Sequence, residues 1–308
     1  MNKSLSVVIP VYLGKSILPE LVSQLVSALE VLQSEFEIIL VDDGCPQDSW
    51  SAIVKESHTD KRIKGVKLAK NFGQQNAINA GLEKVRGDFV VVMDCDLQDK
   101  PDEIINLYKE AKKGFDIVFA RRIDRTDRFL KRLMTSIFYK VFSFLLGVPY
   151  DGTIANFGIY KRHVIDQYNQ LVEKEKVFFT LIRSMGFISG YIEVKHGERY
   201  KGESSYSWNK LIKLAIRIFI SYSDRPLHLV IQLGFTISSL AVLFVIYSIW
   251  SKLSGNIHVP GYASIVASIW FFSGLIIFIL GVIGLYLAQV FKNVKQRPDY
   301  YVQKTENF

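Results

Sequence analysis

The sequence has little cysteine. Cys45 and Cys95 are its only two thiols, and they form no CxxC pair of the kind that marks a zinc or redox site. So few cysteines fit a protein of a reducing cytosol. The histidines show no metal-ligand spacing; the five are His58, His163, His196, His228 and His258. We therefore expect neither a zinc site nor a redox pair.

Charged residues are missing from two long stretches in the second half of the chain. Residues 227–250 and 264–291 contain no Lys, Arg, Asp or Glu. Each stretch exceeds the roughly 20 residues that a helix needs to cross the hydrocarbon core of a membrane. A pair of buried helices in a large globule is the alternative, but uncharged runs of this length are typical of membrane spans. The sequence predicts a two-helix hairpin, with spans over about 227–250 and 265–291.

The charges around these runs predict their orientation. Arg225 precedes the first run, and the loop between the runs carries one cation, Lys252. Three basic residues follow the second run: Lys292, Lys295 and Arg297. Because basic residues favour the cytoplasmic side, we expect both ends of the chain in the cytoplasm. The predicted parts are a cytoplasmic domain over 1–225, a transmembrane hairpin over 226–292 and a cytoplasmic tail over 293–308.

The two ends of the chain carry no strong structural signal. The apolar stretch after Lys3 is short and meets Pro10, so we expect no signal peptide. The tail after Pro298 is polar, and we expect it to be mobile.

The formal net charge of +8 bears on the choice of partner. Nucleic acid is one partner of such a basic chain. The basic residues, however, cluster near the apolar runs. Anionic lipid head groups and phosphate-bearing substrates explain that placement better, so we expect a membrane and no nucleic acid.

The first 120 residues alternate between strand and helix patterns. Apolar β-rich runs predict strands over 5–12, 36–41, 64–68, 89–93 and 115–120. Helical spacing predicts helices over 18–33, 49–57, 75–85 and 101–113. Buried strands that alternate with helices imply an α/β fold, with a mostly parallel sheet that is covered on both faces.

Two carboxylates straddle one residue at the end of the fourth predicted strand. Asp94 and Asp96 follow the run 89–93. Hard cations such as Mg²⁺ prefer oxygen ligands and keep positions for substrate phosphates, and open α/β sheets bind nucleotides at the carboxyl ends of their strands. A solvated turn is the alternative. Gln98 and Asp99 add oxygen donors beyond the strand end and favour a site.

Polar side chains lie at the ends of three predicted strands. Tyr12 ends the first strand, and Asp42 and Asp43 follow the second. Asp94 and Asp96 follow the fourth. Because the carboxyl ends of parallel strands meet at one edge of a sheet, we expect these side chains to line one rim. Asp42 and Asp43 could instead be caps of a helix or turn.

Two further segments are amphipathic and basic. Between 129 and 146, apolar pairs recur every four residues, with cations beside them. Between 208 and 220, one face carries three cations: Lys210, Lys213 and Arg217. Basic amphipathic helices of this kind lie in the membrane interface, and ordinary surface helices are the alternative. We expect interface helices over about 126–146 and 208–222.

Five motifs together give the chain a family resemblance. They are SVVIPVY at 6–12, EIILVDDG at 37–44, KNFGQQNAINAGL at 70–82, GDFVVVMDCDLQD at 87–99 and ERYKGESSYS at 198–207. With its predicted hairpin, the chain from Ser6 to about Arg297 resembles the polyprenyl-phosphate glycosyltransferases. These are the membrane branch of the GT-A family 2 enzymes, which includes dolichol-phosphate mannosyltransferase.

The resemblance implies a fold, an activity and partners. The fold would be the Rossmann-like GT-A fold, and the activity would be hexosyl transfer from a nucleotide sugar, UDP-linked by preference, to undecaprenyl phosphate. The product would be a lipid-linked sugar for modification of cell-envelope glycans, made at a bacterial inner membrane. A homo-oligomer, a tetramer by resemblance, is also implied.

The resemblance further implies roles for individual residues. Asp94, Asp96 and Gln98 would bind Mg²⁺ or Mn²⁺ and, through it, the diphosphate of the sugar nucleotide, with Asp94 and Asp96 as the catalytic pair. The residues that would hold the base and ribose are Pro10, Tyr12, Asp42 and Asp43. The residues that would close over phosphates are Arg199 and Lys201. The residues that would receive the lipid phosphate are Arg121, Arg132 and Ser136.

The chain departs from the family pattern in three places. After Tyr12, relatives usually have Asn-Glu-Glu, whereas this chain has Leu-Gly-Lys-Ser at 13–16. The usual Asp-Phe-Arg segment reads Asn-Phe-Gly at 156–158, so a basic contact is missing there. The common DDGS reads DDGC at 42–45. Three basic residues could also be plain surface charges: Arg121, Arg199 and Lys201.

The implied reaction needs little acid–base chemistry. A phosphate monoester is already anionic near neutral pH, its second pKa being about 6, so its oxygen can attack the anomeric carbon without a general base. A single displacement of this kind inverts the anomeric centre. The protein would supply positioning and charge neutralisation. The alternatives are a processive polysaccharide synthase and a non-catalytic membrane protein, either a nucleotide-binding scaffold or a flippase subunit.

Overall fold

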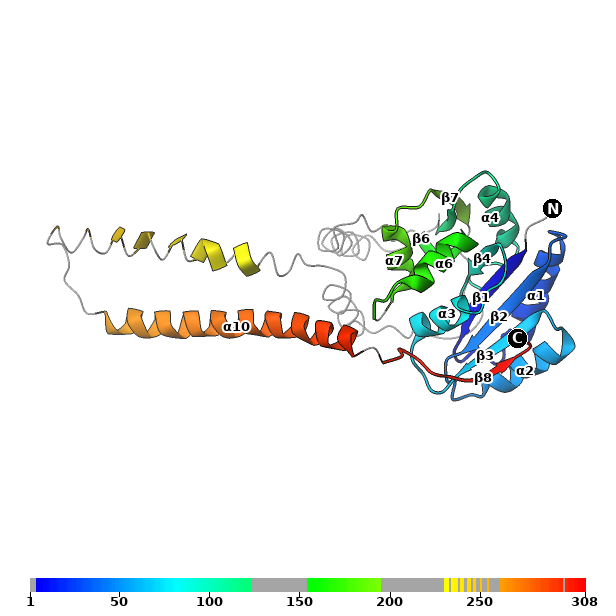
Figure 1. The fold of residues 1–308 in the computed structure, drawn as a ribbon, viewed down its shortest axis with the longest axis horizontal. Helices are drawn as coiled ribbons and strands as arrows, with labels where there is room; N and C mark the ends of the chain where they lie inside the picture. Colours follow the sequence, from blue (N-terminus) through cyan, green and yellow to red (C-terminus); the bar gives the residue numbers. More distant parts are fainter. Residues whose placement is uncertain are drawn as a thin grey trace. The chain divides into compact units, whose positions relative to one another are not determined.

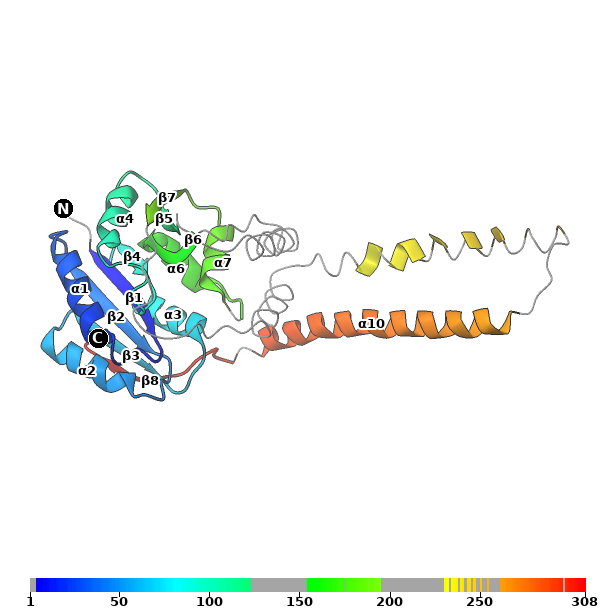
Figure 2. The same cartoon turned by 180° about the vertical axis from the view of Figure 1, so that it is seen from behind.

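The computed structural model describes residues 4–122, 154–174, 176–194, 261–295 and 297–308, with short helical stretches between 230 and 254. The chain divides into two compact units, whose elements are labelled in Figures 1 and 2. The α/β unit comprises Met1–Ser136, Asp151–Ser205 and Arg297–Phe308. The apolar unit comprises Ile137–Tyr150 and Tyr206–Gln296.

One eight-stranded sheet, in the order β7-β5-β6-β4-β1-β2-β3-β8, forms the centre of the α/β unit. Its strands are β1 (Leu5–Val11), β2 (Phe36–Asp42), β3 (Ile63–Leu68), β4 (Phe89–Val92), β5 (Ile117–Arg122), β6 (Ile154–Lys161), β7 (Ser189–Val194) and β8 (Val302–Glu306). The strands β4, β1, β2 and β3 pair in parallel, as do β5 and β7. Only β6 and β8 run antiparallel to their neighbours in the described sheet. The prediction of a mostly parallel sheet is confirmed.

Helices cover both faces of this sheet. On one face lie α1 (Leu18–Glu30), α2 (Ser49–Thr59) and α4 (Glu103–Ala111). On the other lie α3 (Gln74–Leu82), α6 (Arg162–Gln170) and α7 (Phe178–Ser184). Every residue of β1 is consequently buried, which explains its unbroken Val and Ile run, because a strand covered on both faces needs no polar alternation.

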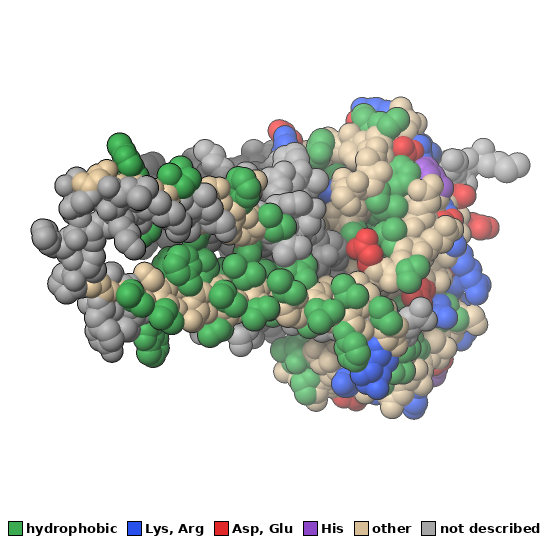
Figure 3. Space-filling model, turned by 60° about the vertical axis from the view of Figure 1, so that its left-hand side comes forward, with side chains coloured by type: hydrophobic (Ala, Val, Ile, Leu, Met, Phe, Trp, Pro, Cys, Tyr) green, Lys and Arg blue, Asp and Glu red, His purple; other side chains and the backbone are tan. Residues whose placement is uncertain are grey.

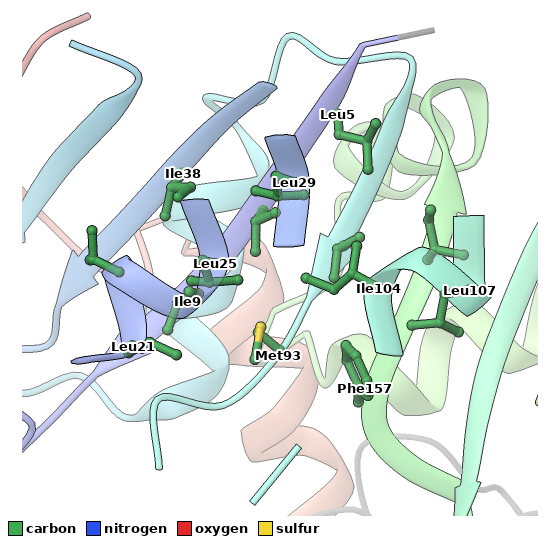
Figure 4. Close-up of a cluster of buried hydrophobic side chains, with 14 of the residues drawn as sticks. Leu5, Ile9, Leu21, Leu25, Leu29, Ile38, Met93, Ile104, Leu107 and Phe157 are labelled. Atoms are coloured by element: carbon green, nitrogen blue, oxygen red, sulfur yellow. The ribbon is translucent and has the colours of Figure 1, made fainter. Parts of the chain in front are cut away.

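The core between α1, α4 and the sheet is shown in Figure 4. From β1 come Leu5 and Ile9, which share a face because successive strand residues point to opposite sides. From α1 come Leu21, Leu25 and Leu29, which recur every fourth residue and therefore share a helix face. Each of these side chains is no more than 1% exposed. Full burial of a leucine contributes roughly 1.5–3 kcal/mol, so this face holds α1 firmly on β1.

On the other face, α3 approaches the sheet closely because it carries a glycine. A Cβ atom at Gly81 would lie 2.4 Å from Cγ1 of Val8 and 3.1 Å from Cγ2 of Val41. Any side chain would therefore push the helix outward. The close approach fixes the position of α3, whose first residue is Gln74.

The elements expected in the first 120 residues are all present, with ends that shift by at most three residues. The expectation of a mobile tail is wrong. Val302–Glu306 is β8, which pairs antiparallel with β3 and covers the edge of that strand. The polar sequence VQKTE gives no hydrophobic signal for a strand, because backbone hydrogen bonds rather than buried side chains attach it to the sheet.

The apolar unit contains the long helix α10 (Tyr262–Val294). Its segment Ser268–Phe291 is the one helix within the described residues that is long and apolar enough to cross a membrane. Its large side chains are exposed, among them Trp270, Phe271 and Ile277, and Figure 3 shows hydrophobic side chains along this helix. The second predicted span is therefore present as a helix of suitable length. The first predicted span is described only as short helical stretches between 230 and 250. Both predicted interface helices lie outside the described residues.

Candidate functional site

The acidic pair follows the end of β4 directly. Met93, the residue after β4, is buried and donates its backbone N–H to the carbonyl of Val8 over 3.2 Å. Asp94, Asp96 and Gln98 come next, and each is partly exposed. The three residues expected to hold a cation therefore lie just beyond the carboxyl end of a buried strand, where their side chains reach solvent.

A tight turn fixes the shape of the segment that carries this pair. The backbone N–H of Gln98 donates to Oδ1 of Asp96 over 3.1 Å. Leu97, between them, has a φ of 59°, in the left-handed region that costs a residue with a Cβ about 1 kcal/mol. The side chain of Leu97 packs against the core, and this packing stabilises the unfavourable backbone. Backbone strain of this kind is common at functional sites.

The side chain of Gln74 connects α3 to the acidic pair. Its amide nitrogen Nε2 donates to Oδ1 of Asp94 over 2.6 Å. Gln74 is the first residue of α3, so the helix that Gly81 holds against the sheet presents this amide. Gln74 was not predicted as a site residue from the sequence, although it lies within the motif at 70–82.

Asp42, the last residue of β2, and Asp43, which follows it, are both buried and both accept backbone hydrogen bonds. Oδ1 of Asp42 accepts from the N–H of Cys45 over 3.1 Å. The two oxygens of Asp43 accept from the N–H groups of Phe72 and Gly73 over 2.7 and 3.0 Å. Burial raises the pKa of each carboxyl, and these hydrogen bonds oppose it. Both residues thus act as caps of turns, the alternative raised from the sequence; their role toward a nucleotide stays a prediction.

The loop after β2 contacts the loop before α3 through their backbones. Gly44 has a φ of 60°, and a Cβ there would lie 2.3 Å from the carbonyl carbon of Lys70 and 2.4 Å from the nitrogen of Asn71. Only glycine fits this contact. The two loops are therefore fixed against each other beside Asp43.

Both cysteines lie against the loop that follows β1. The backbone N–H of Leu13 donates to Sγ of Cys45 over 3.2 Å, and a Cβ on Gly14 would lie 3.4 Å from Sγ of Cys95. Burial raises the pKa of Cys95 to about 11, so the thiol is protonated at neutral pH. The thiols are packing groups of the loop that carries Tyr12, which is 45% exposed.

Arg121 lies at the end of β5, on another part of the sheet. Its guanidinium lies over the ring of Tyr191, 5.1 Å from the ring centroid, and that ring stacks on Phe119 at 5.9 Å. This aromatic contact limits the directions in which the guanidinium of Arg121 points. The other residues expected to bind phosphates lie outside the described residues: Arg132, Ser136, Arg199 and Lys201.

The fold brings most of the described candidate residues to one edge. β1 pairs in parallel with β2 on one side and with β4 on the other, so the three strands end together. This edge carries Pro10, Tyr12, Asp42, Asp43, Asp94, Asp96 and Gln98. Among the described residues, no three His, Cys, Asp or Glu side chains cluster in a way that could hold a metal by themselves. The donor set at this edge is two carboxylates and an amide, which suits a hard cation that shares its remaining positions with a phosphate ligand.

Comparison with known proteins identifies the family. The sequence model described as Glycosyl transferase family 2 matches residues 6–177. The chain belongs to this family.

Family 2 relatives match almost the whole chain, including α10. The uncharacterized glycosyltransferase YkcC of Bacillus subtilis is 31% identical over 301 residues, which are 97% of this chain and 93% of the relative. The undecaprenyl-phosphate 4-deoxy-4-formamido-L-arabinose transferase of Shewanella sediminis is 33% identical over 301 residues, which are 97% of this chain and 91% of the relative.

A solved structure supports the GT-A fold of this family 2 chain. Glucosyl-3-phosphoglycerate synthase from Mycobacterium tuberculosis, in complex with Mn²⁺, uridine diphosphate and phosphoglyceric acid, matches with a TM-score of 0.51 at 12% identity. The match covers 71% of this chain and 77% of that chain. At this identity the likeness shows the fold alone. The mostly parallel α/β sheet expected from the sequence is thus the sheet of a GT-A glycosyltransferase.

Proposed function

We propose that the protein transfers a sugar from a nucleotide sugar, UDP-linked by preference, to undecaprenyl phosphate, and that it inverts the anomeric centre. The main support is similarity along nearly the whole chain, at 33% identity, to an undecaprenyl-phosphate sugar transferase. That similarity extends beyond residues 6–177, the part matched by the family model, and it includes the helix α10. The product would be a lipid-linked sugar for modification of cell-envelope glycans.

A divalent cation, Mg²⁺ or Mn²⁺, is part of the proposal. The carboxylates of Asp94 and Asp96 and the amide of Gln98 are oxygen donors of the type such ions prefer, and all three are partly exposed. When bound, the ion would neutralise charge on the leaving diphosphate. The structural relative from Mycobacterium tuberculosis holds Mn²⁺ together with uridine diphosphate, which is compatible with this assignment.

The chain's own residues orient the reactants in this proposal. Gln74 fixes Asp94 through the 2.6 Å hydrogen bond, so the carboxylate is already oriented before a ligand arrives. Exposed Tyr12 and buried Asp42 and Asp43 would border the base and ribose of the bound nucleotide sugar. Arg199 and Lys201 would close over the diphosphate.

The acceptor phosphate needs orientation rather than activation. It is anionic near neutral pH, its second pKa being about 6. The guanidinium of Arg121 is planar and matches phosphate oxygens in a two-point contact. Tyr191 limits the directions in which this guanidinium points. Arg132 and Ser136 would complete the phosphate site.

We further propose a location at the bacterial inner membrane, where the acceptor lipid resides. The segment Ser268–Phe291 is long enough to cross the hydrocarbon core. Each CH₂ group withdrawn from the bilayer costs about 0.8 kcal/mol, so a long isoprenoid stays in the membrane and the enzyme must come to it. Two membrane helices, cytoplasmic termini and a tetramer belong to the same proposal.

The direct experiment is a transfer assay with the full-length protein in detergent or nanodiscs. Undecaprenyl phosphate and Mg²⁺ are supplied with a panel of radiolabelled nucleotide sugars, including a donor of 4-deoxy-4-formamido-L-arabinose. The expected product is a lipid that carries one sugar and that Asp94→Ala protein does not form. Asp102→Asn, a change of an exposed acid nearby on the chain, is the matched control and should remain active.

The same assay separates the alternatives. A processive synthase would extend its product into a polymer, whereas the proposed enzyme stops after one sugar. A scaffold or flippase subunit would give no lipid-linked product with any donor. Either result would contradict the proposed function.

A further inference from the structure

The C-terminal tail, residues 297–308, is docked along the α/β unit over its whole length. At its start, Nζ of Lys174 donates to the carbonyl of Arg297 over 2.6 Å. In its middle, β8 pairs with β3. Near its end, Nδ2 of Asn307 donates to the carbonyls of Ser57 and Ile63 over 2.6 and 2.8 Å. The tail begins three residues after Val294, the last residue of α10.

One residue of the tail contacts the segment that leads to the candidate site. The carbonyl of Tyr301 accepts a hydrogen bond from the N–H of Ala69 over 2.9 Å. The ring of Tyr301 lies against the ring of Phe72, with centroids 6.2 Å apart at 50°. Tyr301 therefore holds the stretch 69–72 by its backbone and by its side chain.

The stretch 69–74, here called the link segment, continues from this contact to the acidic pair. The N–H groups of Phe72 and Gly73 donate to the carboxylate of Asp43. The next residue, Gln74, donates to Asp94 over 2.6 Å. Within six residues the chain thus passes from the tail, past Asp43, to the carboxylate that is proposed to hold the cation.

Edge protection alone does not account for these contacts. A polar strand such as β8 prevents the exposed edge of β3 from pairing with other chains. The Tyr301–Phe72 ring contact lies outside β8 and beyond the end of β3, at Leu68. It adds nothing to the cover of that edge, but it limits the motion of the link segment.

We propose that the C-terminal tail positions the cation and nucleotide site, and that Tyr301 is the positioning residue. This inference rests on the proposed function, since it deepens the role of Asp94. Tyr301 acts through Phe72 and Gln74, and it touches no substrate. The tail would keep the link segment in the one arrangement in which Gln74 orients Asp94.

The test compares Tyr301→Ala with Tyr301→Phe in the full-length protein. Tyr301→Ala removes the ring contact, and Tyr301→Phe retains it. Tyr301 is 55% exposed, so neither change should prevent folding, which thermal unfolding verifies. Gln303→Ala, a change of another exposed residue of the same tail, is the matched control.

For Tyr301→Ala we expect weaker binding of Mn²⁺ and of UDP-sugar, by about threefold to tenfold, which is the range that one aromatic contact contributes. KM for undecaprenyl phosphate should stay unchanged. The amide protons of Phe72 and Gly73 should exchange faster with solvent. Tyr301→Phe and Gln303→Ala should match the wild type within twofold in every measurement.

Two results would overturn the inference. One is binding of Mn²⁺ and UDP-sugar by Tyr301→Ala that stays within twofold of the wild type. The other is an equal loss for the lipid acceptor, which would indicate a general structural defect. Failure of the proposed function would give a different result, namely no sugar transfer by the wild type. Amide exchange at Phe72 and Gly73 tests the contact with the tail without any reaction.

Discussion

The side-chain amide of Gln74 donates to a carboxylate oxygen of Asp94 over 2.6 Å. This hydrogen bond joins the first residue of α3 to the acidic pair after β4, two positions that are 20 residues apart in the chain. A carboxylate that already has one oxygen occupied by a fixed donor has a defined orientation toward a cation. Groups that orient a metal ligand in this way contribute to metal affinity although they do not touch the metal.

Replacement of Gln74 by methionine should weaken cation binding without loss of the fold. Methionine has a similar length and a similar helix propensity, but it lacks the donor. By comparison with other groups that orient metal ligands, affinity for Mn²⁺ in the presence of UDP-sugar should fall about tenfold to a hundredfold. Titration calorimetry measures the change, and an affinity within twofold of the wild type would show that the hydrogen bond is incidental.

Loss of Lys64 should destabilise the α/β unit, because it leaves a carboxylate buried without its partner. Nζ of Lys64 lies 2.5 Å from Oε2 of Glu37, and both residues are less than a tenth exposed. Lys64→Met should lower the free energy of unfolding by about 3–5 kcal/mol. The double variant Glu37→Gln, Lys64→Met should recover part of this loss, and thermal unfolding in detergent measures both. A double variant less stable than Lys64→Met would contradict the argument.

The same carboxyl predicts a dependence of stability on pH. Burial pushes the pKa of Glu37 upward, but hydrogen bonds from Lys64, Ser6 and the N–H of Arg86 outweigh this effect and leave the pKa below its usual value of 4.5. A lowered pKa in the folded state means that Glu37 stabilises the fold above pH 4.5 and loses this contribution as the pH falls through the lowered value. The difference in unfolding free energy between the wild type and Glu37→Gln should therefore shrink below pH 4.5. A difference that grows on acidification would contradict the lowered pKa of Glu37 in the folded state.

Asn307 allows the docking of the tail to be weakened in two steps. It has a φ of 63°, which glycine also adopts freely. Asn307→Gly therefore removes only side-chain hydrogen bonds: the two that Nδ2 donates to Ser57 and Ile63, and the one that Oδ1 accepts from the exposed Lys61. This change should cost about 1–2 kcal/mol of stability. Asn307→Ala should cost about 1 kcal/mol more, because a residue with a Cβ is strained there. Equal stability of the two variants would show that the backbone relaxes.

Tyr191 should affect the binding of the lipid acceptor, because it orients Arg121. The ring of Tyr191 lies 5.1 Å from the guanidinium, so Tyr191→Ala would remove this constraint on the direction of Arg121. We expect KM for undecaprenyl phosphate to rise about threefold, in line with a cation–π contact at an exposed site. Tyr191→Phe keeps the ring and should behave as the wild type. A rise in KM for the nucleotide sugar instead would place Arg121 at the other substrate.

The sequence predicted the part of the fold that depends on buried runs. The strands from β1 to β5 are apolar over most of their length, and a strand that is buried on both faces shows itself in this way. The rim followed from the same reasoning, because parallel strands end at one edge. Asp42, Asp43, Asp94 and Asp96 lie at or just beyond the ends of such strands. These predictions needed no knowledge of which helix meets which loop.

Long-range contacts could not be predicted in the same way. β8 has a polar sequence and is attached by its backbone to a strand more than 200 residues earlier, so local patterns do not reveal it. Gln74 looks like any polar first residue of a helix until α3 is placed against Val8 and Val41. The cap roles of Asp42 and Asp43 depend likewise on where the loop before α3 comes to lie.

The most direct test of the account is binding of Mn²⁺ to the acidic pair, followed by electron paramagnetic resonance in the presence of UDP. The wild-type protein and Asp102→Asn should bind Mn²⁺ in a UDP-dependent manner, and Asp94→Asn should lose this binding at unchanged thermal stability. If Asp94→Asn binds Mn²⁺ and UDP as tightly as the wild type, the cation is held elsewhere and the central claim is contradicted.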